Sequence, residues 1–303
     1  MGRPARIDRE AGRWSLVDAI PFRLPVYCRN SPALFAVFSI DAGKARALIP
    51  GDEIHPFRLW NRGLLVVSVI DYMDTNIGKY IEFSIAIACT HGGRPAPRML
   101  PALFMGSYGT GQWVFDLPVS TEVSVKGGKG IWGMPKHQAS LNYIIGERTV
   151  SSQYDLDGLL AMKVEIDRPV HTWLPMSTAA VNYCGFRGML FKSTIYFKGK
   201  LGFRLFGKGS GRLLIGEHPR LAPLKALDID PDPVLTAFLP EANGVLDDHF
   251  ECWFLSEEAL PSVVPEGMES VVNLGQSQQW PPPPIPVSMR GDSPPSRGEE
   301  RSA

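Results

Sequence analysis

The sequence predicts a mostly β protein of α+β type, in which antiparallel strands form the main sheet and only a few short helices occur. Residues 80–89 and 191–200 alternate between apolar side chains and polar or small ones, as strands with one buried face do. No part of the chain shows a long 3.6-residue periodicity, so long helices are not expected.

The N-terminal half combines strands with two short helices. Apolar strands are predicted at 33–40 and 63–72, and Asp41 is placed to cap a short helix that Pro50-Gly51 ends after Ile49. Two further short strands are predicted at 102–108 and 112–115. A second short helix is expected to begin near Pro118 and to end at Gly127-Gly128.

The C-terminal half reads as one strand after another. The predicted strands are 138–145, 149–154, 159–166, 191–200 and 212–216, with a last pair between 234 and 255. Their alternation favours antiparallel pairing with one face towards solvent.

The strand at 80–89 has two faces of different character. Four large apolar side chains, suited to a core, share one face: Ile81, Phe83, Ile85 and Ile87. The opposite face carries Tyr80, Glu82 and small residues, and it suits the wall of a cavity in a small barrel that leaves room for a ligand. By pattern alone, a solvated outer face with a single glutamate fits the strand equally well.

Lys136 lies directly after Met134-Pro135 in the stretch 128–141, GKGIWGMPKHQASL. Because proline fixes φ and lacks an N–H, Lys136 is expected where a loop enters a strand and not inside a helix. Trp132 and Met134 are apolar neighbours in sequence, and apolar surroundings disfavour the ammonium form of a lysine. A neutral lysine can attack a ketone and form a Schiff base. A surface lysine at the end of a loop is the alternative.

Two of these segments resemble motifs of the acetoacetate decarboxylase family. The segment I-W-G-M-P-K-H at 131–137 resembles its lysine signature, and D-T-x-x-G-x-Y-x-E at 74–82 resembles its acidic-strand motif. The resemblance implies that Lys136 is the Schiff-base lysine and that Glu82 is an active-site glutamate.

The sequence also departs from the family's pattern. His137 stands where the family usually has a second lysine, and Ser68 stands near the place of a second glutamate. Ser31 stands near the place of an arginine, with Arg29 two residues away. These departures leave the identity of the substrate open.

The resemblance implies a barrel-like fold and a Schiff-base lyase that decarboxylates a small β-keto acid through an imine on Lys136. Glu82 would be the second catalytic residue. The expected substrate pocket consists of Trp132, Met134, His137, Tyr80, Ser68 and Arg29. Two alternatives remain open: an aldolase-dehydratase that joins a pyruvate-like keto acid to an aldehyde, and a catalytically silent barrel that binds a small ligand. The resemblance implies a homo-oligomer and no cofactor.

Composition narrows the partners. The 303 residues include 31 basic and 31 acidic ones, with no basic block, so a nucleic-acid partner is not expected. The apolar run at 64–70 is too short to span a bilayer. Four scattered cysteines without a C-x-x-C motif, and a charged N-terminus without a signal peptide, predict a cytoplasmic protein with no membrane association.

Three segments are predicted along the chain. Residues 1–24 form a polar arm, 25–275 an acetoacetate decarboxylase-like β domain, and 276–303 a disordered tail rich in proline and serine. The cluster Asp247, Asp248, His249 and Glu251 looks like a set of metal ligands, but it is interpreted as a solvated strand edge, and no metal is expected.

Overall fold

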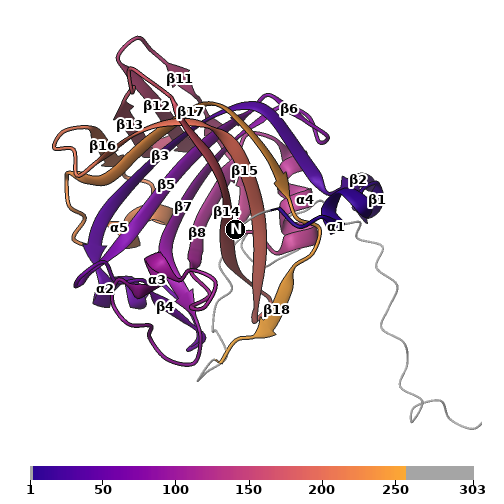
Figure 1. The fold of residues 1–303 in the computed structure, drawn as a ribbon, viewed down its shortest axis with the longest axis horizontal. Coiled ribbons are helices and arrows are strands. Elements are labelled where there is room, and N and C mark those ends of the chain that lie inside the picture. Colours follow the sequence, from indigo (N-terminus) through magenta and orange to yellow (C-terminus); the bar gives the residue numbers. More distant parts are fainter. Residues whose placement is uncertain (1–2, 257–303) are drawn as a thin grey trace, which may run out of the picture.

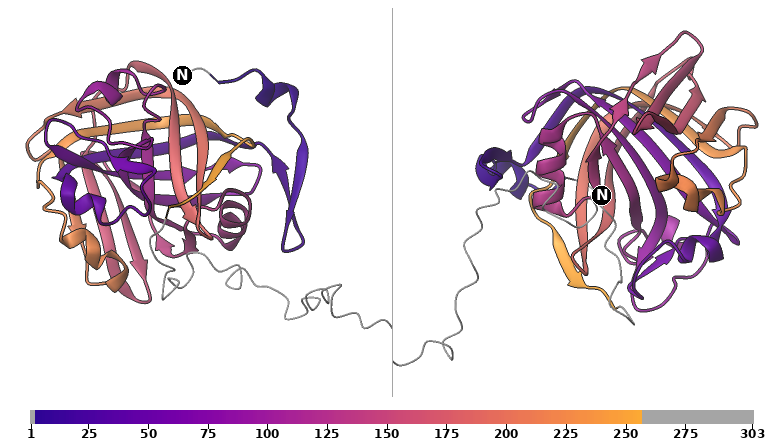
Figure 2. Two further views of the ribbon diagram at one scale, coloured as in Figure 1. Left: turned by 90° about the horizontal axis from the view of Figure 1, so that it is seen from below. Right: turned by 180° about the vertical axis from the view of Figure 1, so that it is seen from behind.

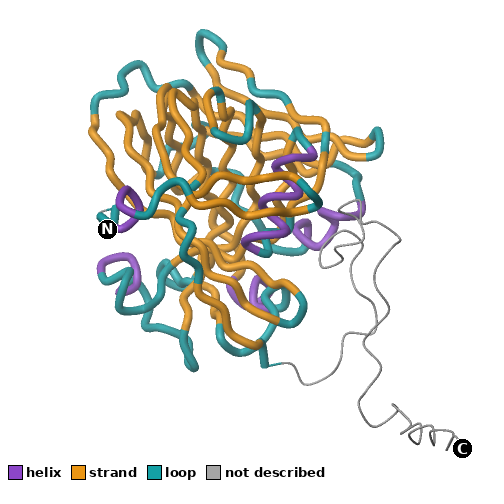
Figure 3. Tube along the Cα trace, turned by 90° about the vertical axis from the view of Figure 1, so that its right-hand side faces the viewer, coloured by secondary structure: helices purple, strands orange, loops and turns teal. Residues whose placement is uncertain are grey.

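The computed structural model describes residues 3–256, and the tail predicted at 276–303 lies outside that range. Strands dominate the trace in Figure 3, which confirms the mostly β prediction. Seven strands close into a barrel in the order β7-β5-β3-β17-β15-β14-β8, and β8 pairs again with β7 (Figure 1). These strands are β3 (Val26–Asp41), β5 (Arg62–Tyr72), β7 (Tyr80–His91), β8 (Gly111–Val119), β14 (Leu174–Phe186), β15 (Met189–Leu205) and β17 (Pro233–Leu246).

Strand pairing is antiparallel around the barrel with one exception. β8 runs parallel to β14, and there Asn182 lies opposite Gln112 and Tyr183 opposite Trp113. Further along its length, β8 also pairs in parallel with the short strand β9 (Lys136–Gln138). The strand β14 was missed by sequence reasoning, because its first half is rich in small residues and alternates only weakly.

A second, smaller sheet packs on the outside of the barrel. It consists of β10 (Ser140–Leu141), β11 (Ile144–Ile145), β12 (Thr149–Leu156), β13 (Leu159–Asp167) and β16 (Gly211–Ile215). Its apolar side chains meet the outward faces of β3, β5 and β7 in the largest core cluster, where Phe38, Phe83 and Met162 are fully buried. The single strand predicted at 138–145 is therefore wrong: the chain there forms three short strands that belong to two sheets.

The short helices match the prediction only in part. In α2 (Ala42–Arg46) the side chain of Asp41 accepts a hydrogen bond from the Lys44 N–H, so the predicted cap is confirmed. The strand predicted at 102–108 is wrong, because α3 (Leu100–Leu103) lies there with Pro101 in its first turn, a position that proline favours. A 3₁₀ turn, η1 (Pro219–Leu221), and the short helix α5 (Ala222–Lys225) follow β16.

The helix before Lys136 is longer than predicted. α4 (Glu122–Trp132) runs through Gly127, Gly128 and Gly130, and it ends at Gly133, whose φ of 64° is left-handed. The earlier glycines do not end the helix; they allow close packing. A Cβ on Gly127 would lie 2.6 Å from the Phe22 ring, and one on Gly130 would lie 2.6 Å from Val17.

Phe22 and Val17 belong to the N-terminal arm, which stands beside α4 (Figure 2). The arm contains α1 (Arg6–Arg9) and the hairpin of β1 (Arg13–Val17) and β2 (Ile20–Leu24). Three short strands complete the fold: β4 (Ile54–Pro56), β6 (Asp74–Thr75) and β18 (Glu251–Phe254). Within residues 3–256, no helix has the length and apolar character needed to cross a bilayer.

The core between the barrel and the second sheet sets a stability prediction. Phe38 on β3 is fully buried there, so Phe38→Ala should lower the free energy of unfolding by ~3–5 kcal/mol through lost burial and a residual cavity. Urea unfolding measures the change. The matched control Phe206→Ala, at a ring that is 60% exposed, should change it by no more than ~0.5 kcal/mol. Equal losses for the two variants would contradict this account of the core.

Candidate active site

The barrel encloses a cavity of about 70 Å³. Tyr80, Glu82 and Ser84, which alternate along β7, all face it, so the predicted cavity wall on this strand is confirmed. Ser68 and Ile70 of β5 line the next part of the wall. A cavity of this size has room for a few non-hydrogen atoms, as a small ligand requires.

Lys136 reaches into the cavity from β9. Its side chain is 5% exposed, and its Nζ lies 2.7 Å from Oε2 of Glu82 and 3.0 Å from Oγ of Ser124, to which it donates. The ring of Tyr80 lies 5.4 Å from the same nitrogen, measured to the ring centre. The amine is thus surrounded by one carboxylate, one hydroxyl and one aromatic face.

The turn between α4 and β9 directs this lysine inward. Gly133 reverses the chain, and the Met134 N–H donates to the Gly128 carbonyl (3.1 Å), a pattern typical of glycine-ended helices. Pro135 then stops any helical continuation. A Cβ on Gly128 would lie 2.4 Å from Cδ of Lys136, so only glycine at this position leaves room for the lysine stem.

Two tyrosines support Glu82. The Tyr72 hydroxyl donates to Oε1 of Glu82 at 3.4 Å, and the rings of Tyr72 and Tyr80 stack with centres 4.5 Å apart. Burial raises the pKa of Tyr72 and of Tyr80 well above the ordinary value, and the nearby Glu82 charge adds to this. Both phenols therefore remain protonated and available as donors.

Sequence reasoning missed Tyr72 and Ser124. Tyr72 could have been found, because a tight turn at 74–78 sets it opposite Tyr80 in the β5–β7 pairing. Ser124 lies on α4, twelve residues before Lys136, and only the packing of the helix against β9 brings it to the amine.

The other residues expected in the pocket divide into two groups. Met134, Tyr80 and Ser68 line the cavity with Lys136 and Glu82. The structure does not bring Trp132, His137 or Arg29 to its wall: Arg29 is exposed on the outside of the barrel. We use the term catalytic cavity for the space lined by Lys136 and Glu82.

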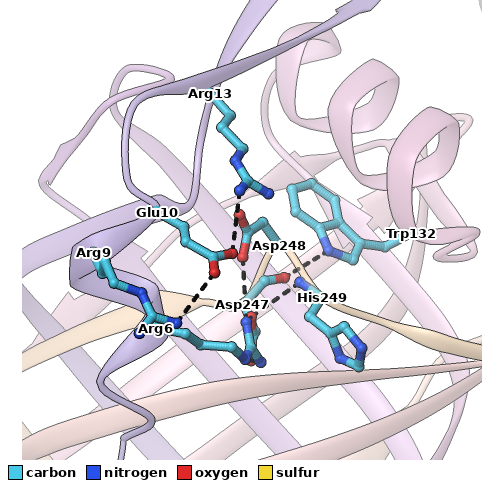
Figure 4. Close-up of polar contacts among 8 residues, drawn as sticks. All are labelled: Arg6, Arg9, Glu10, Arg13, Trp132, Asp247, Asp248 and His249. Carbon is cyan, nitrogen blue, oxygen red and sulfur yellow. Dashed lines mark hydrogen bonds and ion pairs between the residues drawn. The ribbon is translucent and has the colours of Figure 1, made fainter.

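Trp132 instead joins a polar cluster that ties the N-terminal arm to α4 (Figure 4). Its Nε1 donates to the backbone carbonyl of Asp247 at 2.9 Å. The carboxylate of Asp247 accepts two hydrogen bonds from Arg6, at 2.9 and 2.5 Å, and Arg6 lies 3.6 Å from Asp248. The hydrogen bond to Asp247 raises the pKa of Arg6.

The interpretation of this cluster as a solvated strand edge is wrong for Asp247. Its side chain is only 2% exposed, because Arg6 and α1 cover it. Charge pairing with Arg6 of the arm accounts for Asp247 and Asp248, whereas Glu251 pairs with Lys192 of β15. Across residues 3–256, the acidic, histidine and cysteine side chains form no group of three or more that could hold a metal ion.

His137 points away from the catalytic cavity, since successive residues on a strand face opposite sides. Its Nε2 lies 3.0 Å from Oδ1 of Asp116, which also accepts from Nε of Arg220 (2.8 Å), while the Tyr154 hydroxyl donates to Oδ2 (3.1 Å). Burial alone would raise the pKa of Asp116, but the hydrogen bond from His137 and the charges of His137 and Arg220 outweigh it and hold the pKa below its ordinary value. The residue after Lys136 thus anchors β9 to the barrel wall.

A second buried lysine, Lys129, lies on α4. Lys129 is 1% exposed. Burial lowers its pKa to about 8, with a smaller effect from the positive charge of Arg220. It does not line the catalytic cavity, so it serves as an internal comparison for Lys136.

Comparisons with known proteins agree with this fold. The model of a family described as acetoacetate decarboxylase matches residues 8–183, which is more than half of the chain. No curated protein sequence matches the chain significantly.

Several solved structures share the fold. An acetoacetate decarboxylase from Legionella pneumophila is 16% identical, with a TM-score of 0.51 and coverage of 74% of this chain and 85% of that chain. A structure from structural studies of acetoacetate decarboxylase is 17% identical, with a TM-score of 0.53 and coverage of 77% and 91%. The enduracididine biosynthesis enzyme MppR complexed with pyruvate is 13% identical, with a TM-score of 0.51 and coverage of 78% and 92%.

The buried Lys129 makes stability depend on pH. Its pKa is about 8 in the folded protein and ~10.4 in an unfolded chain. Between these values the unfolded chain holds a proton that the folded protein has released, so stability rises with pH across that window. Lys129→Met should therefore be more stable than the wild type at pH 7, by up to ~3 kcal/mol, and the difference should shrink towards pH 10.

Urea unfolding at pH 7, 8.5 and 10 tests this dependence. Lys225→Met, at an exposed lysine, is the matched control, and it should leave the pH dependence of the free energy of unfolding unchanged. If the free energy of unfolding of Lys129→Met depends on pH as that of the wild type does, the Lys129 amine is not desolvated.

Proposed function

The chain belongs to the acetoacetate decarboxylase family, and from this premise we propose that it is a lyase that decarboxylates a small β-keto acid through an imine on Lys136. The observation that carries the proposal is the position of the Lys136 amine. It is buried in the wall of a small cavity, 2.7 Å from the Glu82 carboxylate, and the cavity is otherwise apolar or neutral.

The proposed reaction needs a lysine that can lose its proton. An ammonium group is not a nucleophile, and Glu82 is the group in contact that can accept the proton. The Tyr72 phenol remains bonded to Glu82 and keeps the carboxyl group in place during the transfer. Ser124 holds the amine at a fixed position on the cavity wall.

Lys136 Nζ attacks the ketone carbon, and the carbonyl oxygen leaves as water, which gives a protonated imine. The bond to the carboxylate breaks, its electron pair moves towards the imine nitrogen, and CO₂ departs. Glu82 has given its proton to the departing water by this stage, so it takes up another from solvent and delivers it to the enamine carbon. Water then hydrolyses the imine and releases the ketone and the free lysine.

A second candidate is an aldolase-dehydratase that uses the same lysine with a pyruvate-like keto acid and an aldehyde. Ser68 stands in the cavity wall where the family pattern has a second glutamate, and Glu82 is the one carboxylate among the described residues of the lining. The fold is as similar to MppR in complex with pyruvate as to the decarboxylase from Legionella. Product analysis separates the two, because decarboxylation releases CO₂ from a β-keto acid, whereas the aldol route joins two carbonyl compounds and releases water.

Covalent trapping tests imine formation. Borohydride added with acetoacetate or pyruvate should reduce the imine and add the mass of one reduced substrate to the peptide that contains Lys136, since only an imine is trapped. Lys136→Met should remove the label, and Lys129→Met, at the other buried lysine of this region, should keep it. A label on another lysine would remove Lys136 from the mechanism, and no label with any keto acid would favour the silent ligand-binding barrel.

Glu82 should matter for turnover more than for folding. Glu82→Gln keeps the shape of the side chain but removes its ability to accept a proton, so kcat should fall by ~10²–10⁴-fold. Steady-state kinetics measure the loss, and urea unfolding checks that the variant is folded. Glu217→Gln, at an exposed glutamate, is the matched control. Near-normal turnover in Glu82→Gln would remove Glu82 from the mechanism.

A further inference from the structure

Building on the proposed function, we propose that the substrate carries a long, uncharged apolar chain that lies along the barrel lumen. Its far end would occupy a second cavity of about 340 Å³ beside α3. This cavity, which we name the apolar mouth, is lined mainly by Leu64 and Val66 of β5, Ala88 of β7, Ala102 of α3 and residues 179–181 of β14.

The apolar mouth continues the catalytic cavity. Gln112 and Ala180 line both spaces, so the two cavities adjoin at these residues. Along β5, Ser68 and Ile70 line the catalytic cavity, while Leu64 and Val66 of the same alternating face line the apolar mouth. The same face of β5 therefore lines the barrel lumen from the catalytic cavity to the apolar mouth.

The lining of the apolar mouth favours an uncharged alkyl chain on the substrate. Within residues 3–256, no charged side chain lines the apolar mouth, and Thr110 and Gln112 supply its polar groups. Burial of a charged or strongly polar substituent there would cost free energy that no partner offsets. Methylene groups gain free energy in the same space, because they leave water for an apolar wall.

The distance from the amine sets the length of the chain. Glu82, which contacts Lys136, and Ala88, which lines the apolar mouth, are six residues apart on β7, a rise of ~20 Å. A short keto acid bound to Lys136 ends inside the catalytic cavity. A chain must continue well beyond the keto group to reach α3.

A charged cavity of about 480 Å³ near the N-terminal arm is a poorer candidate for the rest of the substrate. Its lining includes Arg29 and Lys198. Cys28 and Phe197 line both this cavity and the catalytic cavity, but Arg29 and Lys198, the next residues along their strands, face outward. The charged cavity therefore lies on the other side of the barrel wall. A substrate with an anionic far end would be needed to use that cavity, and the lumen does not lead there.

The test is binding of a homologous series. Straight-chain methyl ketones of four, eight, twelve and sixteen carbons share one head group, so isothermal titration calorimetry with the full chain isolates the contribution of the tail. Affinity should rise with length, by about fourfold for each methylene that becomes buried. A sixteen-carbon ketone with a carboxylate at its far end should bind more weakly than its uncharged counterpart.

Variants place the tail. Ala88→Phe and Ala102→Trp fill the apolar mouth from two walls, and each should reduce the affinity ratio of the sixteen-carbon to the four-carbon ketone by tenfold or more. Leu103→Trp introduces the same side chain at the next position of α3, which is 76% exposed and outside the lining, and should keep the ratio. Circular dichroism confirms that each variant is folded.

The outcomes are distinct. An affinity that does not depend on chain length, a ratio unchanged in both filling variants, or tighter binding of the carboxylate-ended ketone would overturn the proposal. Borohydride trapping of the same ketones on Lys136 reports separately on the proposed function. Length-dependent binding without any trapped imine would support the apolar mouth and reject the lyase.

Discussion

The structure depends on the contact between Lys136 and Glu82 inside the barrel. Removing two charged groups from water costs several kcal/mol for each ion, so such pairs are seldom retained for stability alone. The surroundings of the pair offset part of that cost through Ser124, Tyr72 and the Tyr80 ring. Because each partner lies on a different strand, the pair also fixes where β9 sits against β7. Chemistry and barrel geometry are therefore tied to one interaction.

Glycines in α4 make this contact possible, because they let the helix pack closely against residues from other parts of the chain. α4 carries glycines at positions that face Phe22, Lys136 and Val17, so one short helix packs against both Lys136 and the N-terminal hairpin. Trp132 then connects the same helix to Asp247 and through it to Arg6 (Figure 4). The arm is thus packed against the element that delivers the lysine, although no residue of α1, β1 or β2 lines the catalytic cavity.

The sequence predicted the features that depend on local rules. Alternation identified both faces of β7, and the capping rule identified Asp41, because each needs only neighbouring residues. It failed where long-range packing decides: glycines that allow close approach in α4 were interpreted as a helix end, and the small residues of β14 hid a strand. His137 illustrates the same limit for the site, since its neighbour Lys136 faces the cavity while Asp116, 21 residues away, takes its ring to the other side.

The barrel has an odd number of strands. Strands in a ring of seven cannot alternate direction at every step, so at least one neighbouring pair must run the same way. Here the mismatch falls between β8 and β14, which share two residue pairs, whereas β14 and β15 share thirteen. Backbone pairing between neighbouring barrel strands is therefore shortest between β8 and β14. Segments with few backbone hydrogen bonds open at the lowest free energy. An odd number of strands thus gives the barrel one weak seam, and that seam runs beside Gln112, at the junction of the two lumen cavities.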